Sequence, residues 1–208
     1  MNIGGLIFTF NLFCDKILKS PVRKILARVL PKIKTTEEFN MKNHSSARLV
    51  VLSALIAAAY AALTYLSAAF GLAYGEIQFR LSEALNVLAA FTPAAIPGLT
   101  IGCLLSNLTS PFPLDILFGT IATLFASVTI HLLSKAFKRS LPFVSILPPT
   151  AFNAVIVGLQ ATLFTPESTD LLAFIAVALS VAVGEIAVCG LLGVPLFYIV
   201  EKKLKRYL

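Results

Sequence analysis

The chain has 208 residues, of which 58% are hydrophobic and 13% are charged, and its mean hydropathy is +0.89. A soluble domain averages about 45–50% apolar and about 25% charged residues, so this composition excludes an ordinary soluble protein and predicts an integral membrane protein. The net charge of +7 would suit a nucleic-acid-binding protein only if the basic residues formed a patch, and their distribution along the chain argues against one.

The N-terminal part differs from the rest. Seven basic residues fall between Lys16 and Lys34, interleaved with apolar side chains and interrupted by two prolines. This pattern is typical of an amphipathic segment at a membrane surface, and a polar linker follows it. We therefore divide the chain into a basic amphipathic extension with its linker, residues 1–44, and a membrane domain, residues 45–208. We expect residues 1–40 to be dispensable.

Six apolar stretches predict an all-α integral membrane protein with six transmembrane helices. An α-helix rises about 1.5 Å per residue, so about 20 residues cross a hydrocarbon core of about 30 Å. The second and third stretches are shorter, and we expect them to be tilted, shielded or partly re-entrant. The fifth begins with Pro142 and contains the pair Pro148-Pro149, near which we expect a break. The six predicted helices are Arg48–Phe70, Arg80–Phe91, Gly98–Leu108, Leu114–Phe137, Pro142–Phe164 and Leu171–Val200.

The charges between the helices predict the topology. Basic residues cluster in the N-terminal segment, in the loop Lys135–Arg139 and in the tail Lys202–Arg206. With six helices these three clusters share one side, which the positive-inside rule makes the cytoplasm, so both termini are expected there. The charge excess thus accounts for topology without nucleic acid, and we expect a multi-pass protein in the lipid bilayer of a bacterial plasma membrane. Four acidic residues fall on the other side: Glu76, Asp115, Glu167 and Asp170.

Small residues form stripes on the first helix. Ala54, Ala58 and Ala62 recur at four-residue spacing, and Ala57 and Ala61 lie beside them. Small residues at every fourth position let another helix approach closely. The spacing alone leaves open whether that helix belongs to this chain or to a partner.

Four strongly polar side chains precede and begin the second helix: Glu76, Gln78, Arg80 and Glu83. One interpretation is structural, because Arg80 and Glu83 at i,i+3 can pair at a helix start. The other is functional, because alternate positions of an extended loop point to one side, so that Glu76 and Gln78 can face a ligand together. Asp115 is read as a helix cap that suits the dipole at the start of its helix.

Glu185 is predicted near the middle of the last helix. A carboxylate there costs on the order of 2.5 kcal/mol or more by insertion scales, so it must face a cavity or a partner and is a functional candidate. The alternative is a structural glutamate bonded to a neighbouring helix. Asn153 and Gln160 lie on the preceding helix, and we expect these three side chains and the Gly71–Arg80 loop to line one cavity that opens outward.

The chemistry of this set favours a flat heterocycle that is rich in hydrogen-bond donors. Amide side chains offer both donors and acceptors, and a carboxylate can bridge two adjacent N–H groups, as on a guanine-type edge. Tyr74, Phe79 and Phe152 are candidate stacking faces. Because amides within a membrane also hold helices together, the pattern by itself leaves a structural role open.

Motifs for covalent chemistry are absent from the sequence. It has no Gly-x-x-x-x-Gly-Lys-Ser/Thr phosphate loop, no His-Glu-x-x-His and no Gly-x-Ser-x-Gly. Three cysteines, Cys14, Cys103 and Cys189, lack metal-ligand spacing and are interpreted as apolar fillers. We therefore expect no enzyme, no catalytic residues, no metal site and no cofactor.

Six blocks of the sequence resemble a known family. The most specific are the Gln-Phe-Arg-x-Ser-Glu stretch from Gln78 to Glu83 and the Gly184-Glu185 pair. They resemble the QueT family, the substrate-binding S components of energy-coupling factor (ECF) transporters for queuosine precursors, over about residues 45–203. The blocks are Gly75–Leu85, Phe91–Gly98, Gly102–Asn107, Asp115–Gly119, Asn153–Gly158 and Gly184–Cys189.

The resemblance implies an S-component-like bundle of six helices that binds its substrate from outside. It also implies three partner chains, a transmembrane coupling protein and two ATPase subunits, which dock on Ala-x-x-x-Ala faces of the first helix. The pairs Ala54/Ala58 and Ala57/Ala61 fit that pattern.

The substrate implied by the resemblance is a deazaguanine, such as the aminomethyl or nitrile queuosine precursor, or queuine. Glu185 would then meet the donor edge of the base, and Glu76 or Glu83 would meet an aminomethyl cation. The alternatives are a stand-alone facilitator, an S component for another small vitamin or heterocycle, and an intramembrane enzyme that uses Glu185 as an acid or base.

Overall fold

The computed structural model describes residues 41–73, 78–136, 142–164 and 171–204, and within these ranges it contains helices and no strands. The all-α prediction is therefore confirmed for the described part of the chain. The chain forms two units, Met1–Ser46 and Ala47–Leu208, and the second contains every residue predicted for ligand binding or partner docking. The predicted amphipathic extension and the acidic residues Glu167 and Asp170 lie outside the described residues.

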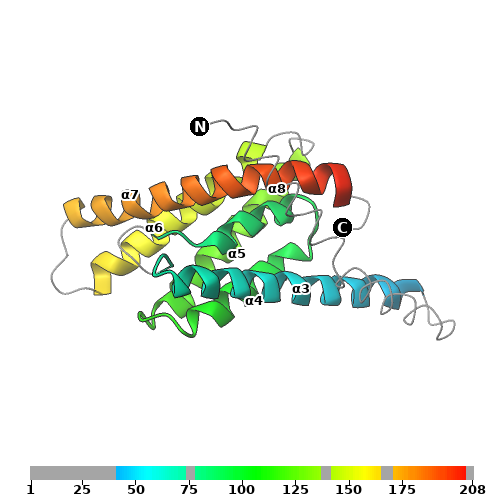
Figure 1. The fold of residues 1–208 in the computed structure, drawn as a ribbon, viewed down its shortest axis with the longest axis horizontal. Coiled ribbons are helices and arrows are strands. Elements are labelled where there is room, and N and C mark those ends of the chain that lie inside the picture. The colour runs from blue at the N-terminus through cyan, green and yellow to red at the C-terminus, as the bar shows by residue number, and fades with distance from the viewer. Residues whose placement is uncertain (1–40, 74–77, 137–141, 165–170, 205–208) are drawn as a thin grey trace. The chain divides into compact units, whose positions relative to one another are not determined.

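The described helices follow the predicted ones in order and closely in extent. Figure 1 shows that α7 continues into α8 as one long helix, coloured orange to red. Two π-helical turns, η4 and η5, belong to this stretch, whereas η2 and η3 are 3-10 helices. The elements are α3 (Met41–Ala69), η2 (Leu81–Ala90), α4 (Ala95–Asn107), α5 (Asp115–Ala136), η3 (Pro142–Ser145), α6 (Leu147–Phe164), α7 (Leu171–Val188), η4 (Cys189–Gly193), α8 (Val194–Ile199) and η5 (Val200–Leu204).

Four helices of the described ranges are long and apolar enough to cross a membrane: Ser46–Ala69, Asp115–Ala136, Leu147–Phe164 and Leu171–Lys203. The second and third predicted spans, η2 and α4, have only 10 and 13 residues. At about 2.0 Å per residue for a 3-10 helix and about 1.5 Å for an α-helix, each reaches about 20 Å, short of the hydrocarbon core. The count of six full spans and the cytoplasmic placement of both termini stay predictions.

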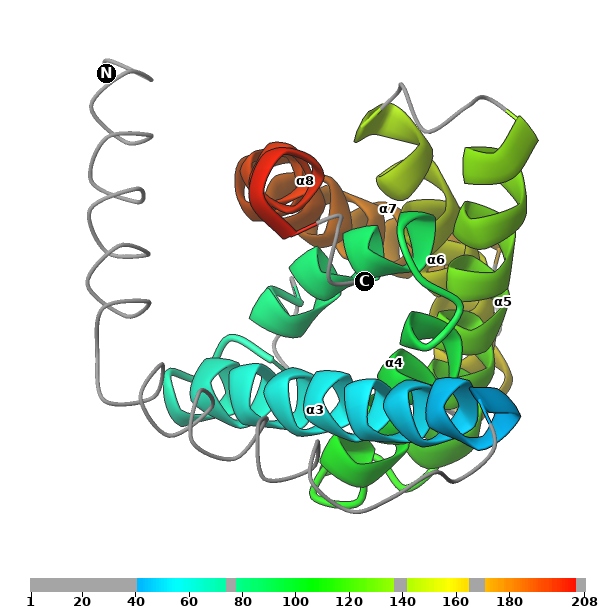
Figure 2. The ribbon, with the colours of Figure 1, turned by 90° about the vertical axis from the view of Figure 1, so that its right-hand side faces the viewer.

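The short helix η2 lies inside the unit. It packs against α4, α5, α7 and α8, and Figure 2 shows it between α3 and α8. Seven of its ten residues are buried, Glu83 and Asn86 among them. Because 3-10 helices longer than 3–4 residues are uncommon, this one depends on the longer helices around it. Of the three expectations for the short helices, the structure shows shielding for η2, because other helices of the chain surround it.

Two glycines on α4 allow α3 to approach closely. A Cβ added at Gly98 would lie 2.8 Å from the carbonyl oxygen of Ser53, and one at Gly102 would lie 2.8 Å from that of Ala57 and 2.7 Å from the Cβ of Tyr60. Glycines four residues apart form the close helix contact typical of membrane proteins. Ala57 is consequently buried against α4. For this residue, the helix that packs on the alanine stripe belongs to the same chain.

The apolar residues divide between a core and an outer surface. The core joins α3, η2, α4, α5 and α8 through side chains that include Tyr60, Leu99 and Phe197. The long helices expose large apolar side chains on their outer faces, such as Leu132 at 60% and Leu172 at 77%. Soluble monomers rarely expose large apolar patches, so this surface suits a lipid environment.

Candidate functional site

The polar segment that begins at Gln78 touches α7 where the functional glutamate was predicted. Phe79 N donates a hydrogen bond to Leu72 O at 2.8 Å, which holds the segment to the end of the preceding turn. A Cβ added at Gly184 would lie 2.0 Å from the carbonyl oxygen of Gln78. The missing side chain of Gly184 therefore lets this backbone reach α7 directly before Glu185.

A first group of buried polar residues, the glutamate cluster, lies where α3, η2, α6 and α7 meet. Tyr60 Oη donates to Glu83 Oε1, and Asn86 Nδ2 donates to Glu83 Oε2 at 2.5 Å. Asn153 Nδ2 donates to Glu185 Oε1 at 2.5 Å. Each member is at most 7% exposed. The cluster consists of Tyr60, Glu83, Asn86, Asn153, Glu185 and Cys189.

Cys189 contacts both glutamate residues of this cluster. Its thiol proton is shared between the backbone carbonyl oxygen of Glu83, 3.6 Å from Sγ, and the carboxyl oxygen Oε2 of Glu185, 3.8 Å from Sγ. Glu83 and Glu185 are near enough for their charges to repel each other, and Arg80 is near enough to attract both. Two like charges buried side by side are unfavourable unless a cation, a proton or hydrogen-bond donors compensate them. The hydroxyl, amide and thiol donors named here are all neutral.

A second group, the arginine cluster, is centred on Asp115 at the start of α5. Arg80 Nη2 pairs with Asp115 Oδ2 at 3.5 Å, and Arg80 Nη1 donates to Asn107 Oδ1 at 3.3 Å. Ser110 Oγ donates to Asp115 Oδ2 at 2.7 Å, and Gln160 Nε2 donates to Asp115 Oδ1 at 2.6 Å. The aspartate thus accepts hydrogen bonds from three parts of the chain. The cluster consists of Arg80, Asn107, Ser110, Asp115 and Gln160.

The two clusters divide the residues that the sequence placed together. Asn153 and Glu185 do meet, whereas Gln160 bonds Asp115 in the other cluster; that all three side chains line one cavity stays a prediction. Seven residues separate Asn153 from Gln160, about 10 Å along an α-helix, so the two amides reach different neighbours.

Sequence reasoning missed several members of the clusters. Asp115 was interpreted as a helix cap, but its carboxylate is the partner of Arg80, a pairing between separate elements that i,i+3 spacing cannot reveal. Tyr60 and Asn86 were not singled out at all. A signal for the arginine cluster existed, because Asn107 and Asp115 both fall in blocks that carry the family resemblance.

The remaining predicted ligand-binding residues have mixed positions. Gln78 is half-buried. The ring of Phe152 packs on Phe125, with 5.7 Å between centroids, and Phe125 is 49% exposed on the outer surface. Tyr74 and Glu76 lie outside the described residues. Ligand contacts by these four residues stay predictions.

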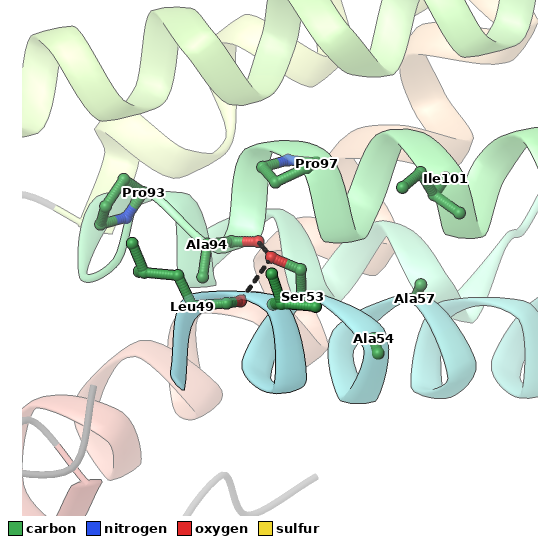
Figure 3. A pocket seen from close by; sticks show the side chains of 9 residues that line it. Leu49, Ser53, Ala54, Ala57, Pro93, Ala94, Pro97 and Ile101 are labelled. Atoms are coloured by element: carbon green, nitrogen blue, oxygen red, sulfur yellow. Dashed lines mark hydrogen bonds between the residues drawn. The ribbon is translucent and has the colours of Figure 1, made fainter. Parts of the chain in front are cut away.

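An apolar groove of about 450 Å³ lies on the surface between α3 and α4 (Figure 3). The hydroxyl of Ser53 lies within 2.8 Å of Leu49 O and 2.9 Å of Ala94 O and bonds to these carbonyls, so it needs no outside partner. The groove therefore offers an apolar surface. It is lined by Leu49, Val50, Ser53, Ala54, Ala57, Pro93, Ala94, Pro97 and Ile101.

The alanines predicted for partner docking separate into two faces. Ala54, Ala58 and Ala62 are exposed, and Ala61 is half-buried. Ala57 is only 5% exposed because Gly102 packs on it. Ala57 packs within its own chain, and docking of a partner on these alanines stays a prediction.

Comparison with known proteins identifies a family whose sequence pattern covers most of the helical bundle. The family model described as "QueT transporter" matches residues 50–202, a range that contains both clusters. The chain belongs to the QueT transporter family. This confirms the resemblance drawn from the sequence blocks. Together with the four apolar helices, QueT membership makes the chain a multi-pass membrane protein.

A curated relative agrees with this assignment. The chain is 41% identical over 75 residues to the "Queuosine precursor transporter QueT" of Lactococcus lactis subsp. cremoris (strain MG1363). That match covers 36% of this chain and 44% of the relative, so it spans less than half of the relative's length. No solved structure matches the chain.

Proposed function

We propose that this chain is the substrate-binding subunit of an ECF-type importer and that its substrate is a queuosine precursor of the 7-deazaguanine class. The observation that carries the proposal is the glutamate cluster. Two buried carboxylates, Glu83 and Glu185, and the amide of Asn153 meet in the interior of a QueT-family bundle. The name of the Lactococcus relative supports the substrate class.

The chemistry of the cluster suits the edge of a guanine-type base. Such an edge presents adjacent N–H donors, and a carboxylate has about four lone-pair sites. Asn153 and Cys189 use one site on each oxygen of Glu185, so acceptor capacity remains for the ligand. We propose that Glu185 bridges two N–H groups of the base.

The sequence has no phosphate loop, so ATP hydrolysis through that motif would have to take place in other chains. We propose that a transmembrane coupling protein and two ATPase subunits supply the energy for transport, and that this chain catalyses no covalent chemistry. The exposed face of α3 formed by Ala54, Ala58 and Ala62 is the proposed docking surface, since small side chains let a partner helix approach.

Calorimetry on the purified protein tests the proposal. We expect binding of aminomethyl-deazaguanine and queuine but not of unrelated vitamins. Glu185→Gln is expected to weaken binding by at least about 30-fold, because the neutral amide carries a donor where the base needs an acceptor. Glu201→Gln, a half-buried glutamate in η5, is the matched control and should bind normally. Failure of every deazaguanine to bind, or unchanged binding by Glu185→Gln, would overturn the proposal.

Isolation of the complex tests the partner assignment separately. Co-purification of this chain with a coupling protein and two ATPases is expected. Uptake into liposomes by the chain alone would instead support a stand-alone facilitator.

A further inference from the structure

We infer, building on the function proposed above, that the site selects amine-bearing, cationic deazaguanines over neutral ones, and that Glu83 and Asn86 together hold the ammonium group. The inference concerns selectivity between the aminomethyl and nitrile precursors, which differ mainly in the group attached to the same heterocycle.

The charges of the two clusters do not balance among the described residues. Three carboxylates, those of Glu83, Asp115 and Glu185, are at most 7% exposed, and one guanidinium, that of Arg80, is 8% exposed. Arg80 forms its ion pair with Asp115 and attracts the two glutamates as well, but one positive charge does not balance three negative ones. The hydrogen bonds to the two glutamates come from neutral groups. A buried charge without a counter-charge is costly, so a ligand cation gains an interaction here that a neutral ligand lacks.

A second observation places the cation beside Glu83. Asn86 is fully buried, and its Nδ2 donates to Glu83 Oε2 at 2.5 Å. Its Oδ1, on the same amide, is buried and has no hydrogen-bond partner among the described residues. Because Oδ1 and Nδ2 belong to one amide and Nδ2 bonds Glu83, we place the ligand donor where it bonds both Oδ1 and this carboxylate. An acceptor without a partner, next to an anion, marks a place for a donor.

An ammonium group matches this arrangement and a nitrile does not. An ammonium has three N–H donors and can bond a Glu83 oxygen and Asn86 Oδ1 at once. A nitrile has no donor, and its nitrogen lone pair would face the lone pairs of the carboxylate. This assignment leaves Glu185 for the ring edge, so each carboxylate serves one donor group of the ligand.

Calorimetry with both precursors on the full-length wild-type chain tests the inference. We expect the aminomethyl form to bind at least about 30-fold more tightly than the nitrile form, the scale of a buried charge pair. Equal affinities, or tighter binding of the nitrile, would overturn the selectivity and leave the proposed function standing. Failure of both precursors and of queuine to bind would overturn the proposed function itself.

Two variants then test the assigned residues. Glu83→Gln is expected to lower the affinity for the aminomethyl form to that for the nitrile form while changing nitrile binding by less than about 3-fold, because only one ligand needs the charge. Asn86→Leu removes the acceptor, together with the amide donor to Glu83, but no charge, and it should weaken binding of the aminomethyl form more than that of the nitrile form. Retained nitrile binding shows that each variant is folded. Unchanged selectivity in both variants would overturn the assignment, and Glu201→Gln should keep wild-type selectivity.

Discussion

Replacing Gly184 with alanine is the substitution whose effect the structure defines most sharply. The new Cβ would lie 2.0 Å from the carbonyl oxygen of Gln78 and 3.0 Å from its carbonyl carbon. Both atoms belong to the backbone, so no change of rotamer relieves the overlap. Real Cβ atoms essentially never come closer than 3.0 Å, so the segment or α7 must move by about 1 Å.

Such a movement should lower stability measurably. Overpacking of a well-packed core typically costs about 1–3 kcal/mol, which for a unit of this size lowers the thermal midpoint by about 3–10 °C. Helix propensity acts in the opposite direction, because alanine is favoured over glycine by about 1 kcal/mol. Arg80 would also be displaced. Its contacts with Asn107 and Asp115 are already long, at 3.3 and 3.5 Å, so a small displacement would break them. We therefore expect weaker ligand binding as well.

The two buried cysteines provide the assay. Cys103 and Cys189 are free thiols that become reactive when the bundle unfolds. A thiol-reactive dye in detergent, with Cys14 replaced by serine in every sample, reports the midpoint. Gly190→Ala is the matched control on the same long helix, because a Cβ there meets nothing within 4 Å. It should be as stable as wild type or slightly more stable. Equal midpoints for Gly184→Ala, Gly190→Ala and wild type would refute the predicted clash.

Three further substitutions test the clusters and the docking face. Asp115→Asn removes the counter-charge of a buried guanidinium and should cost about 3 kcal/mol or more in the same unfolding assay; an unchanged midpoint would contradict a stabilising ion pair. Tyr60→Phe removes the hydroxyl that donates to Glu83, and we expect a loss of about 1.5–3 kcal/mol, with wild-type stability as the contrary result. Ala58→Leu should leave ligand calorimetry unchanged but reduce recovery of the proposed coupling protein and ATPases, because the larger side chain keeps a partner helix away. Val183→Leu, at a 54% exposed position of α7, is its control, and full recovery of the complex with Ala58→Leu would count against docking there.

The positions of the helices followed from local features of the sequence. The predicted span Leu114–Phe137 is observed as Asp115–Ala136. The predicted break near Pro148 is observed as the 3-10 turn η3 followed by a helix that begins at Leu147, which places the prolines in the first turn, where their missing N–H groups cost nothing. The length of an apolar stretch and the prolines and glycines at its ends determine where a helix begins and ends. These are local features, so the sequence is sufficient to predict the helix positions.

The partners of the polar side chains did not follow from the sequence. Gln160 bonds Asp115 and not the Asn153–Glu185 pair. Asp115 accepts from Arg80 and is more than a helix cap. Each of these pairings joins residues that are 32 to 45 positions apart in the chain. Spacing along one helix shows which side chains share a face of that helix. It does not show which other helix packs on that face.

By itself, the sequence determined the all-α membrane class, the order and approximate ends of the helices, the family, and part of the buried polar set, including Glu83, Asn153 and Glu185. Only the tertiary structure decided that Ala57 packs inside the chain, that η2 is shielded, and that the polar residues form two clusters. The physical reason is that helix rotation and depth depend on close backbone contacts, such as those at Gly102 and Gly184. Those contacts set which donors and acceptors face each other, and residues far apart in the chain make them.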